Sequence, residues 1–360
     1  MRRAEFLVAK DPIRDQTGDM AMLRLVMSLA RESLSVRYIG MGPQEQARPD
    51  GVIVEKPRVR LPQVAARALR KGRSAVHERF DVEAFRRAVA QSDADLFVAD
   101  HAYMAEPFLA TGRTSPLYVN TVVSESHVWS AAYGLAGRLQ APAIRRDERR
   151  IARTARSVGT YDEDEAAEYR AAGIDRVRWL DLTLRARADI PARDLDAPRV
   201  AFVGDRQWRP NAEGLRVLLE MWPRIRAGIP GAELVIVGRA DAELQLPEGV
   251  RDLGFVDDLD GLLATCRAVL APIRTGGGVR VKILEAASRG LPVVGTRAAI
   301  GSLDGVLGLT AVEGAEFIEE ARRMLQDPAH ARVAGEELDA RNRAHWAEGA
   351  PQRAVAEWLA

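Results

Sequence analysis

Short apolar segments alternate with amphipathic segments along nearly the whole chain, and this alternation constrains the fold more than any other feature. In the first half, strands are predicted at residues 6–9, 36–39, 95–99, 117–123, 157–160 and 177–180, and helices at 20–32, 82–91, 144–156 and 163–172. Strand–helix alternation of this kind predicts a parallel sheet covered by helices on both faces.

The second half repeats the pattern. Strands are predicted at 199–204, 233–237, 250–253, 268–271 and 292–295, and helices at 211–227, 259–265, 280–289, 313–325, 329–346 and 351–359. A chain of 360 residues is too long for one ordinary core. We therefore expect an α/β protein with two doubly wound, Rossmann-like domains that face a central cleft, where the carboxyl ends of the strands would bind a ligand.

The domain bounds follow from a polar stretch between the two halves. Residues 187–198 contain Pro191 and Pro198 and few apolar side chains, which is typical of a linker. We predict a first domain at 1–188, a linker at 189–197 and a second domain at 198–345. The last segment, 346–360, is expected to pack back on the first domain.

Composition excludes several classes of protein. The apolar content of 47% is too high for a disordered chain, and a net charge of +1 indicates no attraction to nucleic acid. Cys266 is the single cysteine, so no internal disulfide forms and a reducing, cytoplasmic location is expected. No apolar run has the length of roughly 18 residues that a membrane span needs.

The segment 272–296 carries the strongest chemical signal. A predicted strand leads into Gly276, Gly277 and Gly278, and then into a helix with Arg280 and Lys282 in its first turn. Glycines let backbone N–H groups approach an anion, whereas cations in a first turn oppose the helix dipole unless an anion is bound there. The spacing fits neither a Walker A loop nor GxGxxG. The alternative is a glycine turn with Lys282 and Glu285 as a surface pair.

Lysine is rare in this chain, which makes Lys282 informative. Of the 52 basic residues only Lys10, Lys56, Lys71 and Lys282 are lysines. A coding bias explains the excess of arginine, but a compact ammonium also suits a phosphate oxygen. One turn later, Glu285 is placed to accept two ribose hydroxyls, the further requirement for a nucleotide diphosphate. Pairing of Glu285 with Arg289 or with Lys282 is the alternative.

The segment PIRTGGGVRVKILEAASRGLPVVGT resembles the donor site of the retaining GT-B glycosyltransferases of the large family four. It is most similar to the branch that reads P-[IL]-R-x-G-G-G-x-R-x-K-x-x-E-A. The resemblance includes VAFVGDRQWRPNAEGL, which matches the G-x-x-x-W-x-P-N segment of that branch, and covers roughly residues 198–360. The first half matches only in layout.

This resemblance implies transfer of a sugar from a nucleotide-diphospho-sugar (UDP-, GDP- or dTDP-linked) to an acceptor hydroxyl, with retention and with no metal or other cofactor. The acceptor would be a glycan, a lipid-linked molecule or a small molecule. By position, Arg280 and Lys282 would hold the diphosphate and stabilise its growing charge. Glu285 would hold the ribose, and Val256, in the loop 254–257, would lie beside the base.

Two positions depart from the family pattern. Many members have the acids E-x7-E, but here Gly277 stands where the first acid is expected, so the sugar is not inferable. Many also have R-x5-K after the strand that corresponds to 199–204. Here Arg206 and Arg209 are present without the lysine, and Arg206 is the predicted phosphate contact. A solvated loop arginine is the alternative.

In the first half, the resemblance implies a pocket histidine just after the fourth strand, and His101 stands there as the candidate for contact with the donor sugar or the acceptor. His127, close to Glu125, is its rival. Related chains often read H-N-x-E near that point, whereas this chain reads V-V-S-E, so Glu125 is matched and the histidine of that pattern is missing. Gly18 lies where the family's first-loop glycine approaches a substrate, although a simple turn before a helix explains it nearly as well.

The segment 56–80 is basic, with Val64, Ala65, Ala68 and Leu69 among its arginines. It could contact anionic lipid or an anionic acceptor, or simply be a solvated helix face.

Two alternative functions are consistent with the sequence: a GT-B sugar-nucleotide epimerase or hydrolase, and a non-catalytic subunit that binds nucleotide. No nucleic-acid partner is expected.

Overall fold

The computed structural model describes residues 1–15, 17–239, 245–275 and 277–360. The chain divides into two compact units, Met1–Leu182 with Pro351–Ala360, and Thr183–Ala350. The boundary between Leu182 and Thr183 lies before residue 188, the predicted end of the first domain. The predicted linker, 189–197, therefore belongs to the second unit. The second division falls after Ala350, whereas the bound expected from the sequence was residue 345.

The first unit is built on one mixed sheet with the strand order β3-β4-β2-β1-β5-β6-β7-β8. Among the described residues its strands are β1 (Arg3–Leu7), β2 (Ser35–Gly42), β3 (Gln46–Arg48), β4 (Gly51–Glu55), β5 (Leu96–Asp100), β6 (Leu117–Asn120), β7 (Ser157–Thr160) and β8 (Val177–Trp179). All neighbours pair in parallel except β3 with β4. The order steps outward from β1 in both directions, as in a doubly wound sheet.

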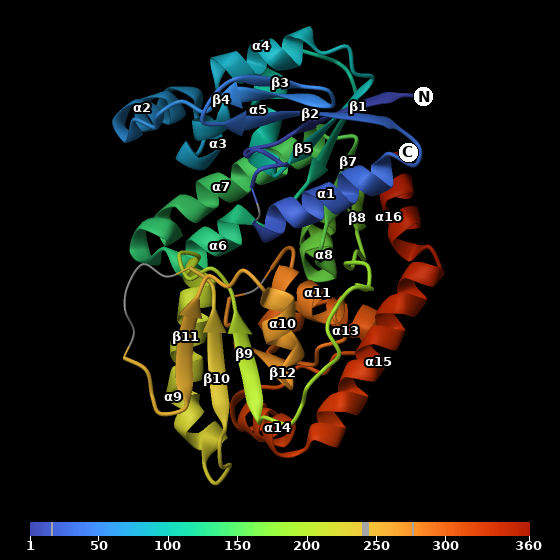
Figure 1. The fold of residues 1–360 in the computed structure, drawn as a ribbon. Helices are drawn as coiled ribbons and strands as arrows, with labels where there is room; N and C mark the ends of the chain where they lie inside the picture. Colours follow the sequence, from blue (N-terminus) through green and yellow to red (C-terminus); the bar gives the residue numbers. More distant parts are fainter. Residues whose placement is uncertain (16, 240–244, 276) are drawn as a thin grey trace. The chain divides into compact units, whose positions relative to one another are not determined.

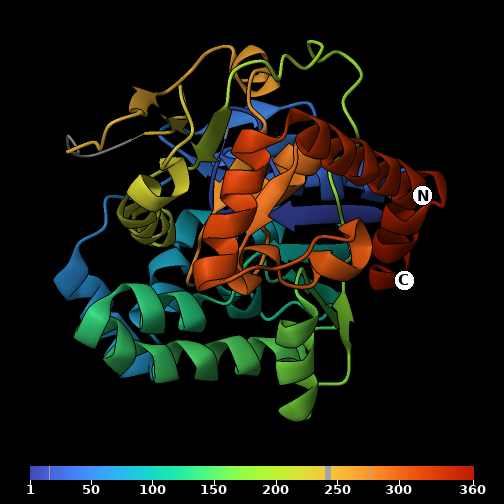
Figure 2. The same ribbon diagram turned by 90° about the horizontal axis from the view of Figure 1, so that it is seen from below.

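The helices of this unit connect its strands, except α16 near the end of the chain (Figure 1). They are α1 (Gly18–Ala30), α2 (Leu61–Lys71), α3 (Ala75–Phe80), α4 (Glu83–Gln91), the 3₁₀ turn η1 (Ala102–Met104), α5 (Ala105–Ala110), α6 (Glu125–Ala132), α7 (Gly134–Thr154), α8 (Glu163–Ala171) and α16 (Ala350–Trp358). In both views α6 and α7 lie side by side (Figures 1 and 2). The core lies where apolar strand residues such as Phe97 meet Phe85 of α4 and Ile151 of α7, all fully buried.

The end of the chain completes the first unit. Trp358, at the end of α16, is 1% exposed and packs edge-on against Tyr118 of β6. The hydroxyl of Tyr118 donates to the carbonyl of Ala360 (3.0 Å), and Arg2 donates to the carbonyl of Leu359 (3.0 Å). Burial of an indole of this size stabilises the unit by a few kcal/mol.

The second unit has a smaller, wholly parallel sheet with the order β11-β10-β9-β12-β13. In its described part the strands are β9 (Arg199–Val203), β10 (Glu233–Val237), β11 (Val250–Gly254), β12 (Ala268–Ala271) and β13 (Val293–Gly295). The helices are α9 (Arg209–Arg226), α10 (Leu259–Ala264), α11 (Val281–Ala287), α12 (Arg297–Ile300), α13 (Leu303–Leu307), α14 (Gly314–Gln326) and α15 (Pro328–Ala347). Trp222 of α9 and Phe317 of α14 join the strands in one core.

Both sheets confirm the predicted α/β class and the two Rossmann-like units. The strands and helices of the second half agree with the predicted ranges to within about two residues, except that α12 and α13 were missed. In the first half, β3, β4, α2, α3, η1, α5 and α6 lie outside the predicted ranges, and α7 begins at Gly134 rather than at residue 144. Pro142 lies inside this helix, although proline usually ends one.

Candidate functional site

The loop between β12 and α11 brings several of the predicted residues together. Gly277 and Gly278 have φ values of +147° and +63°, which side chains with a Cβ rarely adopt. A Cβ on Gly277 would meet nothing within 4 Å, so the conformation rather than crowding calls for glycine. Gly276 lies outside the described residues. This loop leads directly into Arg280 and α11.

Lys282 lies in the first turn of α11 and is partly buried. Its Nζ donates to Oδ1 of Asn211 (2.5 Å) and lies 5.4 Å from the centre of the Phe202 ring. Within the described residues no carboxylate lies at ion-pairing distance, and burial lowers the pKa of Lys282 to about 7. The second unit thus holds an ammonium group between an amide oxygen and an aromatic ring, without the negative partner that would keep it charged.

Arg280 immediately precedes α11, and its guanidinium packs against the chain at Gly301. One of its nitrogens donates to the carbonyl of Gly278 (3.1 Å). A Cβ on Gly301 would lie 2.0 Å from another, so a larger residue there would displace the guanidinium. Gly301 also has a positive φ of +49°. Glycine at this position therefore leaves the space that the guanidinium occupies.

Glu285 lies one turn after Lys282, and its side chain is 36% exposed. Its Oε2 pairs with Arg289 of the same helix, and Arg289 also binds Oδ1 of Asp260 (2.8 Å). Of the two alternatives raised from the sequence, pairing with Arg289 is the one the structure contains. The carboxylate is held on the side of α11 by this pair, and Lys282 points to Asn211 instead.

Arg206 is engaged by its own unit. Its two terminal nitrogens bind both oxygens of Asp252 (2.5 and 2.9 Å), one also donates to the carbonyl of Gly238 (2.7 Å), and the side chain is 5% exposed. Partial burial acts to raise the pKa of Asp252, but the hydrogen bonds from Arg206 lower it below its usual range. Arg206 therefore links the ends of β10 and β11, and we leave it out of the proposed ligand contacts.

Val256 lies in the loop after β11, beside Phe255, which is 77% exposed.

Asn211, at the start of α9, was not among the predicted site residues, although the Pro-Asn pair that contains it was part of the resemblance. Besides accepting from Lys282, it donates to the carbonyl of Asp205 (2.9 Å), which orients its amide oxygen toward the lysine. Asn211 is thus a positioning residue for Lys282.

In the first unit, His101 follows β5 and is buried, with 7% exposed. It is the single non-glycine residue with positive φ (+73°) among those described. Its Nδ1 lies 3.5 Å from Oδ2 of Asp100, and its ring stacks on Tyr103. Burial acts to lower the pKa of His101, but the hydrogen bond and charge of Asp100, with the charges of Glu125 and Asp19, raise it overall.

Gly18 begins α1, one residue before Asp19. Lys10 after β1 binds Asp19 (2.7 Å) and the hydroxyl of Thr17 (3.1 Å). Because Asp19 and Glu125 both act on His101, the first turns of α1 and α6 gather around the end of β5. This edge of the sheet therefore concentrates titratable groups.

The rival histidine, His127 in the first turn of α6, pairs with another helix. His127 is 36% exposed and pairs through Nε2 with Glu168 of α8 (3.2 Å).

In the basic segment, α2 buries Val64 and Ala68 and exposes Leu69. The four apolar residues noted in the sequence therefore do not form one exposed apolar face. No helix among the described residues is both long and apolar enough to cross a membrane.

Comparisons with known proteins concern the second unit and the fold as a whole. Residues 197–327 match the family described as Glycosyl transferases group 1. A comparison with curated proteins found no match. Sucrose-phosphate synthase from Thermosynechococcus elongatus superimposes with a TM-score of 0.74 at 17% identity, covering 98% of this chain and 97% of that one.

Two further solved structures are similar over their whole length. WaaG, a glycosyltransferase involved in lipopolysaccharide biosynthesis, has a TM-score of 0.69 at 14% identity, covering 98% of both chains. Anabaena HepE in complex with UDP and glucose has a TM-score of 0.65 at 15% identity, covering 100% of this chain and 99% of that one. The fold is therefore GT-B, and the family match to the second unit together with this fold supports a glycosyltransferase.

Proposed function

We propose that this protein transfers a sugar from a nucleotide-diphospho-sugar to an acceptor hydroxyl, and that the second unit binds the donor. The observation that carries the proposal is the environment of Lys282. Lys282 has an ammonium group with a pKa lowered to about 7, held by Asn211 beside a glycine loop. A bound diphosphate would supply the negative charge that the described surroundings of Lys282 lack.

Donor binding would use the loop and the first turns of α11. Backbone groups at Gly277 and Gly278 would approach the phosphates, and Arg280 and Lys282 would neutralise them. Glu285 would accept hydroxyls of the ribose, while Val256 would lie beside the base. HepE was crystallised with UDP-glucose and starch synthase IV from Arabidopsis thaliana with ADP, which agrees with a nucleotide-sugar donor here.

The cations would act mainly on the leaving group. As the glycosidic bond breaks, negative charge grows on the diphosphate, and Arg280 and Lys282 stabilise it. Fixed donors of this kind lower a barrier by about 3–4 kcal/mol each when water is excluded. Two cations supplied by the chain would perform the role that a metal ion has in other transferases, so we propose a metal-independent reaction. Retention of configuration is proposed from the resemblance of the donor segment alone.

The acceptor side is proposed to involve His101. A buried histidine whose pKa is raised by neighbouring carboxylates is suited to hold a proton near a sugar hydroxyl. The group around β5 and the first turn of α1, including Gly18, would then face the sugar that is transferred. Since Cys266 is a buried free thiol, the cytoplasm stays the proposed location.

Binding of nucleoside diphosphates tests the donor site. UDP, GDP, dTDP and ADP are added separately at millimolar concentration while the melting temperature is measured. We expect one of them to raise it, and Lys282→Ala to remove most of the increase, while Lys56→Ala, a lysine substitution in the first unit, leaves it unchanged. If none of the four shifts the melt, the donor-site proposal fails.

Product analysis then separates the three reactions that this fold could support. Incubation of the preferred nucleotide sugar without an acceptor would reveal an epimerase as an altered sugar nucleotide, and a hydrolase as free sugar. A transferase gives a new glycoside only when an acceptor is present. Binding without any turnover of the nucleotide sugar would instead support the non-catalytic subunit.

A further inference from the structure

The first unit contains a cavity of about 650 Å³ that the proposed transfer does not use. Every lining residue lies between positions 57 and 87, in the loop after β4, in α2, α3 and α4, or in the turn between α3 and α4. This volume is in the range of small-molecule sites in proteins. The cavity is formed entirely within one unit, so its shape depends only on local packing.

The walls of the cavity are strongly cationic. They contain eight arginine or lysine side chains and three carboxylates. Of the cations, five have no carboxylate at ion-pairing distance among the residues that the structure describes, namely Arg58, Arg60, Arg70, Arg79 and Arg87. A concave surface lined by one sign of charge concentrates ligands of the opposite sign.

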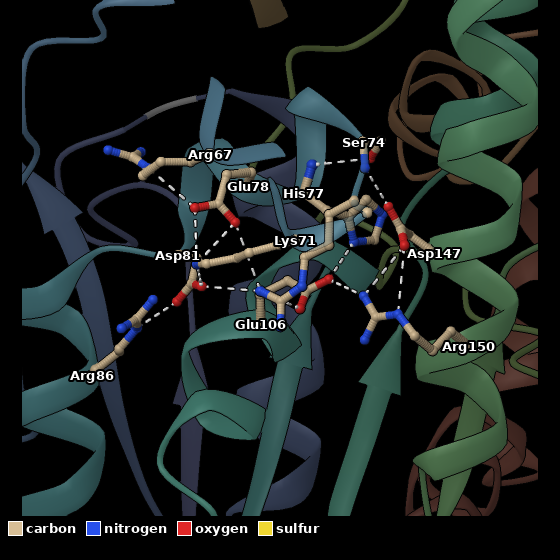
Figure 3. A network of polar contacts seen from close by, with 12 residues as sticks. Arg67, Lys71, Ser74, His77, Glu78, Asp81, Arg86, Glu106, Asp147 and Arg150 are labelled. Carbon is tan, nitrogen blue, oxygen red and sulfur yellow. Dashed lines mark hydrogen bonds and ion pairs between the residues drawn. The ribbon is translucent and has the colours of Figure 1, made fainter. Parts of the chain in front are cut away.

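Two of the three carboxylates, Glu78 and Asp81, are buried and already paired with cations (Figure 3). Glu78 is fully buried and binds Lys71 (2.9 Å) and Arg67 (3.1 Å). Asp81 is 1% exposed and binds Lys71 (2.9 Å) and Arg86 (2.5 Å). Burial acts to raise the pKa of Asp81, but these hydrogen bonds lower it. The third carboxylate, Glu83, is 71% exposed and pairs with Arg86.

The same network anchors the helices that carry three of these five arginines, Arg70, Arg79 and Arg87. Glu106 of α5 binds Arg73 (3.1 Å), His77 of α3 (3.1 Å) and Arg150 of α7, and Asp147 of α7 accepts from the backbone N–H of Ser74 (2.6 Å). Figure 3 shows these side chains converging from separate helices. Buried, multiply bonded ion pairs of this kind hold one arrangement, so the rim of the cavity is positioned before a ligand arrives.

We propose that this cavity binds a small polyanion, a molecule of saccharide size that carries several sulfate, phosphate or carboxylate groups. Guanidinium groups form paired hydrogen bonds with the oxygens of all three. Five of them spread around one cavity match several separate negative groups better than a single phosphate. A lipid surface would instead meet the protruding side of α2, where Leu61 and Leu69 are exposed, and neither residue lines the cavity.

The test is titration calorimetry of the full chain with a sulfated pentasaccharide. We expect saturable binding that weakens with added salt, and a loss of roughly tenfold in affinity for Arg58→Gln/Arg60→Gln. The matched control is Arg138→Gln/Arg145→Gln, which removes two exposed charges from α7 of the same unit. Lys282→Met is included because the cavity is independent of the donor site, and its affinity should equal that of the wild type.

Each remaining outcome contradicts the proposal. Absence of binding at millimolar pentasaccharide overturns it directly. Equal losses in the cavity variant and in the α7 control would show a general charge effect. Loss of binding in Lys282→Met would place the ligand at the donor site. Finally, binding to phosphatidylcholine vesicles that contain phosphatidylglycerol, without binding of the pentasaccharide, would assign the segment 56–80 to a lipid surface.

Discussion

Lys71 and Lys282 are two of the four lysines of this chain, and their surroundings are opposite. Lys71 lies in a saturated network, where its Nζ contacts both Glu78 and Asp81 at 2.9 Å. Lys282 has an amide oxygen and an aromatic ring as its neighbours, and its pKa is lowered to about 7. The comparison separates a cation that stabilises the fold from one whose partner is expected to come from a ligand.

Substitution of the two lysines should give the largest difference. We expect Lys282→Met to reduce kcat/KM for sugar transfer by a factor on the order of 10²–10³, because it removes a charge that stabilises the leaving group. Lys71→Met should retain most of the activity per folded molecule. Steady-state kinetics with a nucleotide sugar measures both, and equal losses would abolish the distinction between the two sites.

The network around Lys71 should determine stability instead. Glu78→Gln leaves Arg67, Lys71 and Arg73 short of a fully buried partner and is expected to lower the free energy of unfolding by about 3 kcal/mol. Urea denaturation measures the change. The control, Glu83→Gln, alters an exposed pair and should change stability by less than about 0.5 kcal/mol. A nucleotide-induced rise in melting temperature should persist in both variants.

Substitution of Glu285 tests whether its carboxylate only pairs with Arg289 or also binds the ribose. We expect Glu285→Gln to weaken binding of the preferred nucleoside diphosphate roughly tenfold, since an ionised acceptor for the ribose is lost. A 2′,3′-dideoxy analogue should bind equally to both proteins. If the variant weakens the normal nucleotide and the analogue alike, Glu285 only supports α11 through Arg289.

The smallest expected effect is a proton taken up on binding. A lysine with a pKa of about 7 is mostly neutral at pH 8, and a bound diphosphate favours its charged form, so binding consumes up to about one proton. Affinity for a nucleotide sugar should therefore fall as the pH rises above about 7. Calorimetry in buffers of different ionisation enthalpy measures the uptake, which should vanish in Lys282→Arg. Uptake that survives this substitution comes from another group.

The same pKa shift predicts a change in the free protein. A lysine whose pKa is lowered on folding destabilises the fold at every pH below its unfolded pKa, and the cost is complete once the pH is below the folded pKa of about 7. Lys282→Met should thus raise the melting temperature by a few degrees near neutral pH in the absence of nucleotide.

Much of the second unit could be predicted because its signals are local. Each strand is a short apolar run that ends near a turn residue, and the donor segment places its glycines, Arg280, Lys282 and Glu285 in one stretch of sequence. The choice of partner for each charge was not predictable in the same way. Asn211 meets Lys282 only through tertiary packing. Arg206 was predicted as a phosphate contact from its place in the family pattern, and its pairing with Asp252 on another strand required the structure.

The structure of the first unit was harder to predict, because there too the partner of each charged side chain is set by tertiary packing. Glu78, Asp81, Glu106 and Asp147 resemble surface acids in the sequence, yet the fold buries all four beside arginines and lysines from several helices. The short strand β4 was hidden beside a basic segment, and α7 continues through Pro142. His101 could be selected from its place after a strand, whereas the pairing of His127 with Glu168 required the structure.

The position of α16 has a consequence for the order of events during synthesis. The first unit includes Trp358, which is fully buried, and bonds to the carbonyls of Leu359 and Ala360. A ribosome makes the chain at roughly 5–20 residues per second from the N-terminus. The first unit therefore waits, with the site of Trp358 unfilled, while the entire second unit is translated. The part of the protein that is made first is the last to be completed.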